Sequence, residues 1–171
     1  MKKVELVCLI FLSTLILGAC QNHDKISISQ DFEQMPGWNS HPNLVKGKGN
    51  SGFYFTRTGP DQDYSQTFSM KLVDISDKPI RRIDMGAWVR ISSSLAKAKL
   101  VLSIESADSI MYWQSIRSED VNPKPGEWTR LYFTYDLPVT IKPEHTVKMY
   151  LWNESKKEVD ADDFDIHFYT K

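Results

Sequence analysis

The sequence contains few cysteines, no excess charge of either sign and no long apolar run. Its 171 residues include two cysteines, and 21 lysines and arginines face 22 acidic residues, for a net charge of −1. This balance argues against nucleic acid as a partner, because phosphate backbones bind strongly basic surfaces. The apolar stretch Leu6–Leu17 is shorter than the roughly 20 residues that a membrane-spanning helix needs.

The first 19 residues have the organisation of a secretion signal. Two lysines precede the apolar stretch, and the small pair Gly18-Ala19 stands directly before Cys20. This order predicts a signal peptide over residues 1–19 that is removed from the mature chain. Removal leaves 152 residues with a net charge of −2 and with Cys20 as their one cysteine, so we expect no disulfide.

The segment Leu17-Gly18-Ala19-Cys20 resembles the lipobox of bacterial lipoproteins. The resemblance implies covalent lipid on Cys20 and attachment to a membrane through that lipid. Two or three acyl chains anchor a protein firmly, whereas one chain binds only marginally. Gln21 is not the aspartate that retains many lipoproteins at the inner membrane, which implies the outer membrane. Residues 20–29 would be the lipidated cysteine and a short tether that leads into the first strand. An ordinary signal peptide with a chance cysteine is the alternative.

From Lys25 onward, apolar and polar residues alternate with a period of two, which predicts strands. The clearest case is the set Ile83, Met85, Ala87, Val89 and Ile91. Pro and Gly pairs such as Pro36-Gly37 and Gly59-Pro60 separate the strands. About eight or nine short strands with one apolar face each predict an all-β fold, a two-sheet antiparallel β-sandwich.

Five motifs resemble the carbohydrate-binding modules of families 4, 9 and 22. They are Asp31-Phe32-Glu33 with Pro36-Gly37-Trp38, Ser51-Gly52-Phe53, Gly86-Ala87-Trp88-Val89-Arg90, Pro125-Gly126-Glu127-Trp128-Thr129 and Asp162-Asp163-Phe164. The resemblance implies a jelly roll with galactose-binding-like topology over residues 30–171. It also implies a protein that is not an enzyme and that retains a polysaccharide or oligosaccharide.

The same fold also serves protein contacts, so fold alone does not decide function. Carbohydrate-binding modules usually accompany a catalytic domain, and this sequence shows none. The alternative is therefore an accessory lipoprotein whose jelly roll contacts other outer-membrane proteins. A broad, flat apolar patch would favour that alternative.

The acidic stretch over residues 160–165 contains a change in the alternation. Apolar residues occupy odd positions up to Ala161 and even positions from Phe164 onward, so the side of the strand that faces inward switches at Asp162-Asp163. This switch predicts a β-bulge. In the resembled family, acids at these places and nearby backbone carbonyls hold a structural Ca²⁺. The resemblance carries that site to Glu33, Asp163 and the carbonyls of residues 48–50, all oxygen donors that suit the ion. A solvated acidic strand end is the alternative. A glycosidase would need a second carboxylate across a cleft, and the sequence places none there.

Several aromatic residues lie opposite the apolar set of their strands. A sugar ring packs its C–H face on an aromatic plane while neighbouring polar groups fix its orientation. The predicted ligand-binding residues are Trp88, Arg90, Tyr112, Trp113, Gln114, Arg130, Tyr132 and Trp152. Alternatively, these rings fill a face of the sandwich beneath a loop. The hydroxyl residues show no histidine and acid arrangement for a nucleophile, so we predict no catalytic residue.

Overall fold

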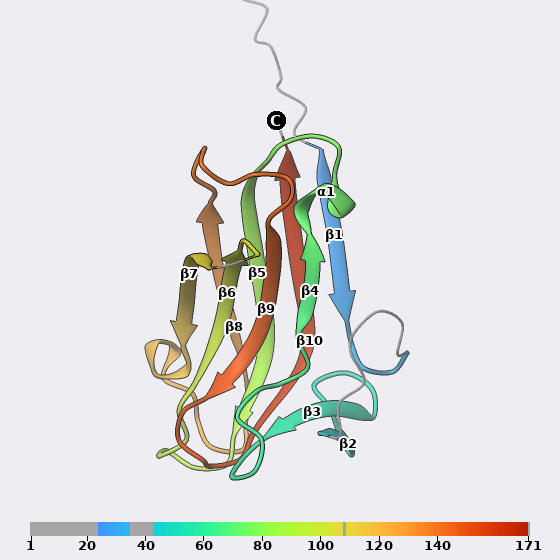
Figure 1. Cartoon of the computed structure of the whole chain (residues 1–171). Coiled ribbons are helices and arrows are strands. Elements are labelled where there is room, and N and C mark those ends of the chain that lie inside the picture. The colour runs from blue at the N-terminus through green and yellow to red at the C-terminus, as the bar shows by residue number, and fades with distance from the viewer. Residues whose placement is uncertain (1–23, 35–42, 108, 171) are drawn as a thin grey trace, which may run out of the picture.

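The computed structural model describes residues 24–34, 43–107 and 109–170, which form two stacked antiparallel β-sheets (Figure 1). The first sheet has six strands, namely β1 (Lys25–Gln30), β2 (Leu44–Lys46), β3 (Tyr54–Thr58), β5 (Ile80–Ile91), β8 (Trp128–Asp136) and β10 (Val159–Thr170). The second has β4 (Phe68–Lys71), β6 (Ala98–Glu105), β7 (Ile110–Arg117) and β9 (Thr146–Asn153). The described helices are a short α1 (Leu72–Ile75) and a 3₁₀ turn, η1 (Ser118–Val121). The predicted all-β sandwich is confirmed.

The long strand β10 organises the six-stranded sheet, whose order is β2-β3-β10-β5-β8. The first part of β10 pairs with β3, from Val159 opposite Thr58. Its remainder pairs with β1, from Phe164 opposite Gln30 to Tyr169 opposite Lys25. The first strand, β1, is therefore hydrogen-bonded to the last strand, β10. The four-stranded sheet has the order β4-β9-β6-β7.

The predicted β-bulge is present in β10. The pairing of β10 with β5 shifts register between Asp162 and Asp165, and Asp163 has a φ of 46°. The extra residue lets Ala161 before the bulge and Phe164 after it both face the core, where each is fully buried. The bulge thus allows apolar residues at odd positions before it and at even positions after it to face the core from one strand.

The hydrophobic core lies between the sheets. On β5, Ile83, Met85, Ala87 and Val89 are fully buried, and Ile91 nearly so. Leu100, Leu102 and Ile104 of β6 face them from the other sheet in the same apolar cluster. One apolar face per strand is therefore enough to build the core, as the alternation predicted.

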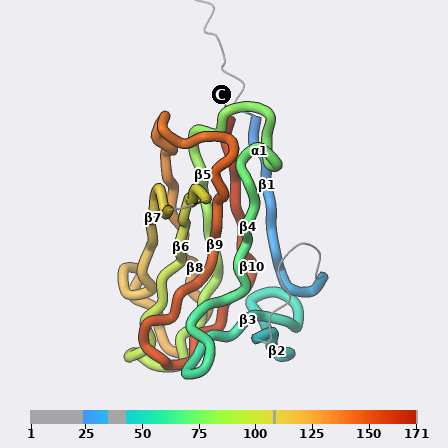
Figure 2. The backbone as a smooth tube through the Cα atoms, viewed as in Figure 1, coloured from blue at the N-terminus to red at the C-terminus, as the bar shows by residue number. Residues whose placement is uncertain are grey.

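Both described ends of the chain lie at one end of the sandwich (Figure 2). The backbone N–H of Thr170 donates to the Asp24 carbonyl at 3.1 Å. The helix α1 and the loop from β8 to β9 lie at this same end (Figure 1). Among the described residues, no helix is long and apolar enough to cross a membrane.

Candidate functional site

The structure divides the eight predicted ligand-binding residues among three surfaces. The outer face of the six-stranded sheet holds Trp88, Arg90, Arg130 and Tyr132, which share register across β5 and β8. The outer face of the four-stranded sheet holds Trp113 and Trp152. Tyr112 and Gln114 alternate with Trp113 on β7, and Tyr112 packs against the core and against Tyr135. Because the two outer faces point in opposite directions, one groove cannot contain all eight residues.

The charged groups on the outer face of the six-stranded sheet are largely paired with one another. The carboxylate of Asp160, which is 5% exposed, lies 2.6 Å from Arg57 Nε and 2.8 Å from Arg90 Nη2. The Arg90 guanidinium lies over the Trp128 ring at 4.5 Å and near the Phe55 ring at 5.2 Å. These rings and cations therefore hold the sheet together.

Arg130 fills the centre of the same face. It forms an ion pair with Asp165, donates to the Asp163 carbonyl at 3.1 Å and lies 6.0 Å from the Trp88 ring. A Cβ on Gly86 would come within 2.4 Å of its guanidinium, so glycine makes room for the arginine. Burial lowers the pKa of Arg130. Its hydrogen-bonding capacity is directed to the chain itself.

The outer face of the four-stranded sheet carries a continuous group of aromatic rings, Tyr64, Trp113, Tyr150 and Trp152, hereafter the aromatic row. Tyr64 stacks on Trp152 with 6.3 Å between ring centroids and 20° between planes. Trp113 meets Trp152 edge-on at 6.4 Å, and Tyr150 meets Tyr64 at 5.7 Å. Tyr64 is 46% exposed and Trp113 is 38% exposed. The row thus offers accessible ring surface that the chain does not cover.

A backbone bridge between Tyr64 and Trp152 brings the segment before β4 onto this face. Neither Tyr64 nor Tyr150 belonged to the predicted set. Tyr150 has the same parity as Trp152 on β9, so the alternation already indicated its face. Tyr64 lies outside the regular strands, and no periodicity could place it beside β9.

Polar side chains surround the aromatic row. Lys99 Nζ lies 4.9 Å from the Trp152 ring centroid and bonds Glu154 at 2.8 Å. Glu105 pairs with Lys148 and accepts a hydrogen bond from the Ser103 hydroxyl at 2.8 Å. A depression of about 450 Å³ adjoins the row, and it is lined by Tyr64, Thr67, Ser69, Glu105, Lys148 and Tyr150. Burial raises the pKa of Tyr150.

This arrangement can bind a ligand that presents flat apolar faces and hydroxyl groups. Rings supply contact with C–H surfaces, while Glu105, Lys148 and the serines supply acceptors and donors. Among residues 24–34, 43–107 and 109–170, no group of three His, Cys, Asp or Glu side chains could hold a metal ion.

The acidic residues predicted to bind calcium lie around the loop of residues 47–54. Glu33 Oε1 accepts hydrogen bonds from the backbone N–H groups of Phe53 and Tyr54 at 2.6 and 2.7 Å. Asp163 accepts from the Asn50 side chain at 2.7 Å and from the Ser51 hydroxyl at 2.6 Å. Both acids therefore already bind the loop through hydrogen bonds. Their oxygen donors suit Ca²⁺, but among the described residues no group of three His, Cys, Asp or Glu side chains is arranged to hold a metal ion, and calcium stays a prediction.

Asp162 also binds the loop of residues 47–54 through hydrogen bonds. Its Oδ2 accepts from the backbone N–H groups of Asn50 and Ser51 at 2.8 and 3.2 Å. Burial raises the pKa of Asp162 to about 6. A Cβ on Gly49 would meet this carboxylate at 2.6 Å, so the loop approaches β10 as closely as glycine permits. Trp38, which belongs to the first family motif, lies outside the described residues.

No family model matches this chain, and no curated protein matches it in sequence. Among solved structures, the CBM22-1 xylan-binding domain from Paenibacillus barcinonensis has a TM-score of 0.56 at 16% identity, over 87% of this chain and 97% of that one. The CBM22-2 xylan-binding domain of that organism has 0.57 at 13% identity, over 81% and 97%. The C-terminal family 22 module of Clostridium thermocellum has 0.55 at 10%, over 88% and 91%. The fold is that of family 22 carbohydrate-binding modules, as the sequence motifs predicted.

Proposed function

We propose that this chain is a non-catalytic carbohydrate-binding protein that holds a polysaccharide on the aromatic row. The observation that carries the proposal is the row itself: exposed rings in mutual contact beside a polar depression. Two modules of the same fold are xylan-binding domains, and a third has a cleft with residues for ligand binding. Xylan is therefore the first polysaccharide to test.

The geometry of the row favours a chain-like ligand over a single sugar. Tyr64 lies next to β9, Trp152 lies on β9, and Trp113 lies on β7, with β6 between these strands. The rings thus extend across the sheet, and successive sugar rings of one polysaccharide could contact successive aromatic rings. The adjoining polar groups would fix the orientation of the bound sugars.

The proposal also places this module on a membrane. A covalent lipid on Cys20 would hold the domain at the bacterial outer membrane, where it would retain polysaccharide close to the cell. Support for this part comes from the signal sequence and the lipobox resemblance of residues 17–20. The described exposed apolar residues, such as Phe53, Leu95 and Ile110, belong to different loops and strand ends. These three residues therefore form no broad apolar patch of the kind that would favour the accessory-protein alternative.

The test compares two tyrosines that are equally exposed on opposite faces. Tyr64 and Tyr132 are each 46% exposed, so truncating either one should perturb folding to a similar and small extent. We expect Tyr64→Ala to weaken xylan binding about tenfold or more, which corresponds to about 1.4 kcal/mol. Tyr132→Ala should bind as the wild type does. Affinity electrophoresis in xylan gels and isothermal titration calorimetry with xylo-oligosaccharides measure the difference.

Thermal unfolding of both variants verifies that each remains folded, and a panel of other plant and bacterial polysaccharides tests selectivity. Loss of binding in Tyr132→Ala with retention in Tyr64→Ala would move the site to the predicted residues Trp88, Arg130 and Tyr132. A wild-type chain that binds no polysaccharide in the panel would contradict the proposal.

A further inference from the structure

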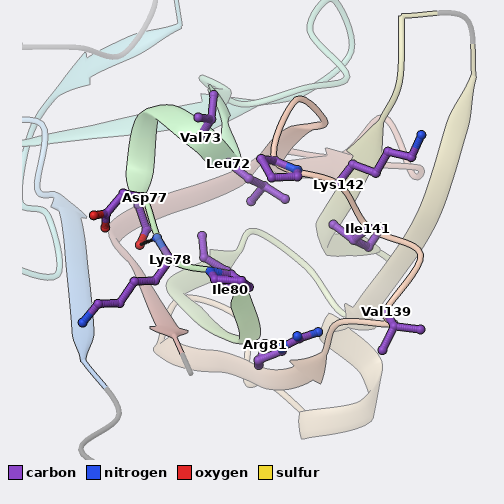
Figure 3. Close-up of a pocket in the computed structure, with 12 residues that line it drawn as sticks. Leu72, Val73, Asp77, Lys78, Ile80, Arg81, Val139, Ile141 and Lys142 are labelled. Atoms are coloured by element: carbon purple, nitrogen blue, oxygen red, sulfur yellow. Dashed lines mark hydrogen bonds between the residues drawn. The ribbon is translucent and has the colours of Figure 1, made fainter.

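An apolar pocket of about 320 Å³ lies at the end of the sandwich that contains α1 (Figure 3). Two loops form it, one from α1 to β5 and one from β8 to β9, which includes Val139 and Ile141. Backbone hydrogen bonds join the two loops: Val73 N–H donates to the Pro143 carbonyl at 2.8 Å, and Leu137 N–H donates to the Arg81 carbonyl at 2.7 Å. The pocket is therefore a preformed part of the fold, and it shares no lining residue with the depression beside the aromatic row.

The lining of this pocket combines exposed apolar side chains with three cations, Lys78, Arg81 and Lys142, and one acid, Asp77. Val139 is 85% exposed and Val73 is 50% exposed, while Leu72 and Ile80 beneath them are buried. The charged ends of Lys142 and Lys78 extend outward from the pocket in Figure 3. Single exposed valines are ordinary on soluble proteins. Two valines around one apolar pocket, with lysines beside them, form the pattern of a surface that meets the boundary between lipid headgroups and acyl chains.

The pocket lies close to the predicted lipid anchor, and this position indicates a membrane as its partner. Lys78 Nζ forms an ion pair with the Asp24 carboxylate, so the pocket adjoins the first described residue. Cys20 precedes Asp24 by four positions, and four residues span at most roughly 14 Å when fully extended. A lipid on Cys20 would therefore hold the bilayer surface within about this distance of Asp24.

We propose that this pocket, with Val73, Val139, Lys78 and Lys142 on its rim, docks on the phospholipid bilayer that holds the Cys20 lipid. The valines enter the boundary between headgroups and acyl chains, and Lys142 meets the phosphates, while Lys78 stays paired with Asp24. The sandwich then stands on this end, and the aromatic row on its side faces the aqueous phase. This inference rests on the proposed lipid anchor and does not depend on which polysaccharide binds.

The test uses the lipidated chain in vesicles of phosphatidylethanolamine and phosphatidylglycerol. Cys8 leaves with the signal peptide and lipid blocks the Cys20 sulfur, so Val139→Cys introduces a unique thiol for an environment-sensitive dye. The matched control is Lys124→Cys, because Lys124 is 78% exposed in its side chain and precedes the opposite end of β8. Quenching by nitroxide-labelled lipid and by aqueous iodide reports where each dye lies.

We expect the dye at position 139 to shift to shorter wavelength on vesicles, to be quenched by the nitroxide lipid and to resist iodide. The dye at position 124 should show none of these changes, and adding Val73→Asp should restore iodide quenching at position 139. Equal iodide quenching at both positions in chains that float with the vesicles would overturn the docking and leave the anchor intact. A chain that does not float with vesicles would overturn anchor and docking together, while xylan binding remains a separate measurement.

Discussion

His167 lies on the outer face of the six-stranded sheet, with its Nδ1 3.0 Å from the Ser27 hydroxyl. Burial lowers its pKa from the ordinary 6.5, and the nearby cations Lys25 and Arg130 lower the pKa further. Asp165 lies 3.4 Å from Nε2, but Arg130 already pairs with that carboxylate. The folded state therefore accepts a proton on His167 less readily than the unfolded chain does.

This difference predicts a pH dependence of stability at the junction of β1 and β10. Below about pH 6.5 the unfolded state binds more protons at this position than the folded state does, so the contribution of His167 should lower the free energy of unfolding as the pH falls. His167→Gln should reduce that slope between pH 7 and pH 5. Urea denaturation at several pH values measures it, and an unchanged slope in the variant would contradict the role of His167.

At the scale of elements, the loop of residues 47–54 depends on three acids from distant parts of the chain. Glu33 follows β1, and Asp162 and Asp163 lie in the bulge of β10. Glu33 and Asp162 accept hydrogen bonds from backbone N–H groups of the loop, whereas Asp163 accepts from the Asn50 side-chain amide and the Ser51 hydroxyl. The bulge therefore does more than keep the apolar residues of β10 facing the core. Asp163, which has a positive φ in the bulge, is a second acid of β10 that hydrogen-bonds the loop.

The calcium prediction can be tested on this loop. If Ca²⁺ binds Glu33 and Asp163, it binds the folded state only, and removing it should lower the melting temperature. A chelator should then destabilise the wild-type chain by several degrees, and Asp163→Ala should abolish that sensitivity. Differential scanning calorimetry with and without chelator measures both effects. A wild-type melting temperature that does not respond to chelator would leave the loop held by hydrogen bonds alone.

At the scale of the whole molecule, the two sheets have different surfaces although both were built by the same alternation. The six-stranded sheet pairs its outward charges internally, as Asp160 does with Arg57 and Arg90. The four-stranded sheet leaves aromatic rings accessible. The proposed binding surface, the acidic loop and the end of the chain that leads to Cys20 therefore lie on three separate parts of the domain.

The proposed location of the protein depends on Cys20. Cys20→Ser removes the sulfur that would carry the diacylglyceryl group, so we expect the variant to lose fatty-acid label and to remain an unlipidated precursor. Metabolic labelling with a fatty-acid probe measures the label, and the size of the chain on a gel reports the precursor. The variant domain should still bind xylan as the wild type does. Equal label on the wild type and on Cys20→Ser would place the lipid elsewhere or exclude it.

Much of the architecture could be predicted from local pattern. Alternation placed Ile83, Met85 and Ala87 on the core face, and the parity change at Asp162-Asp163 located the bulge. Both follow from one physical rule, that successive side chains on a strand point to opposite faces. The motifs added the jelly-roll class, which the structural comparisons confirm.

The sequence by itself determined which residues face outward, but only the tertiary structure decided which of them lie together. Trp88 and Trp152 satisfy the same alternation rule, yet they lie on opposite sheets, because strand parity says nothing about which sheet a strand joins. The sequence alone could not show whether Arg130 is free to bind a sugar. In the structure Arg130 forms an ion pair with Asp165 of β10. Tyr64 lies 88 positions before Trp152, and only a backbone bridge between distant segments stacks the two rings. Contacts across such separations depend on how the sheets are assembled, which no local pattern records.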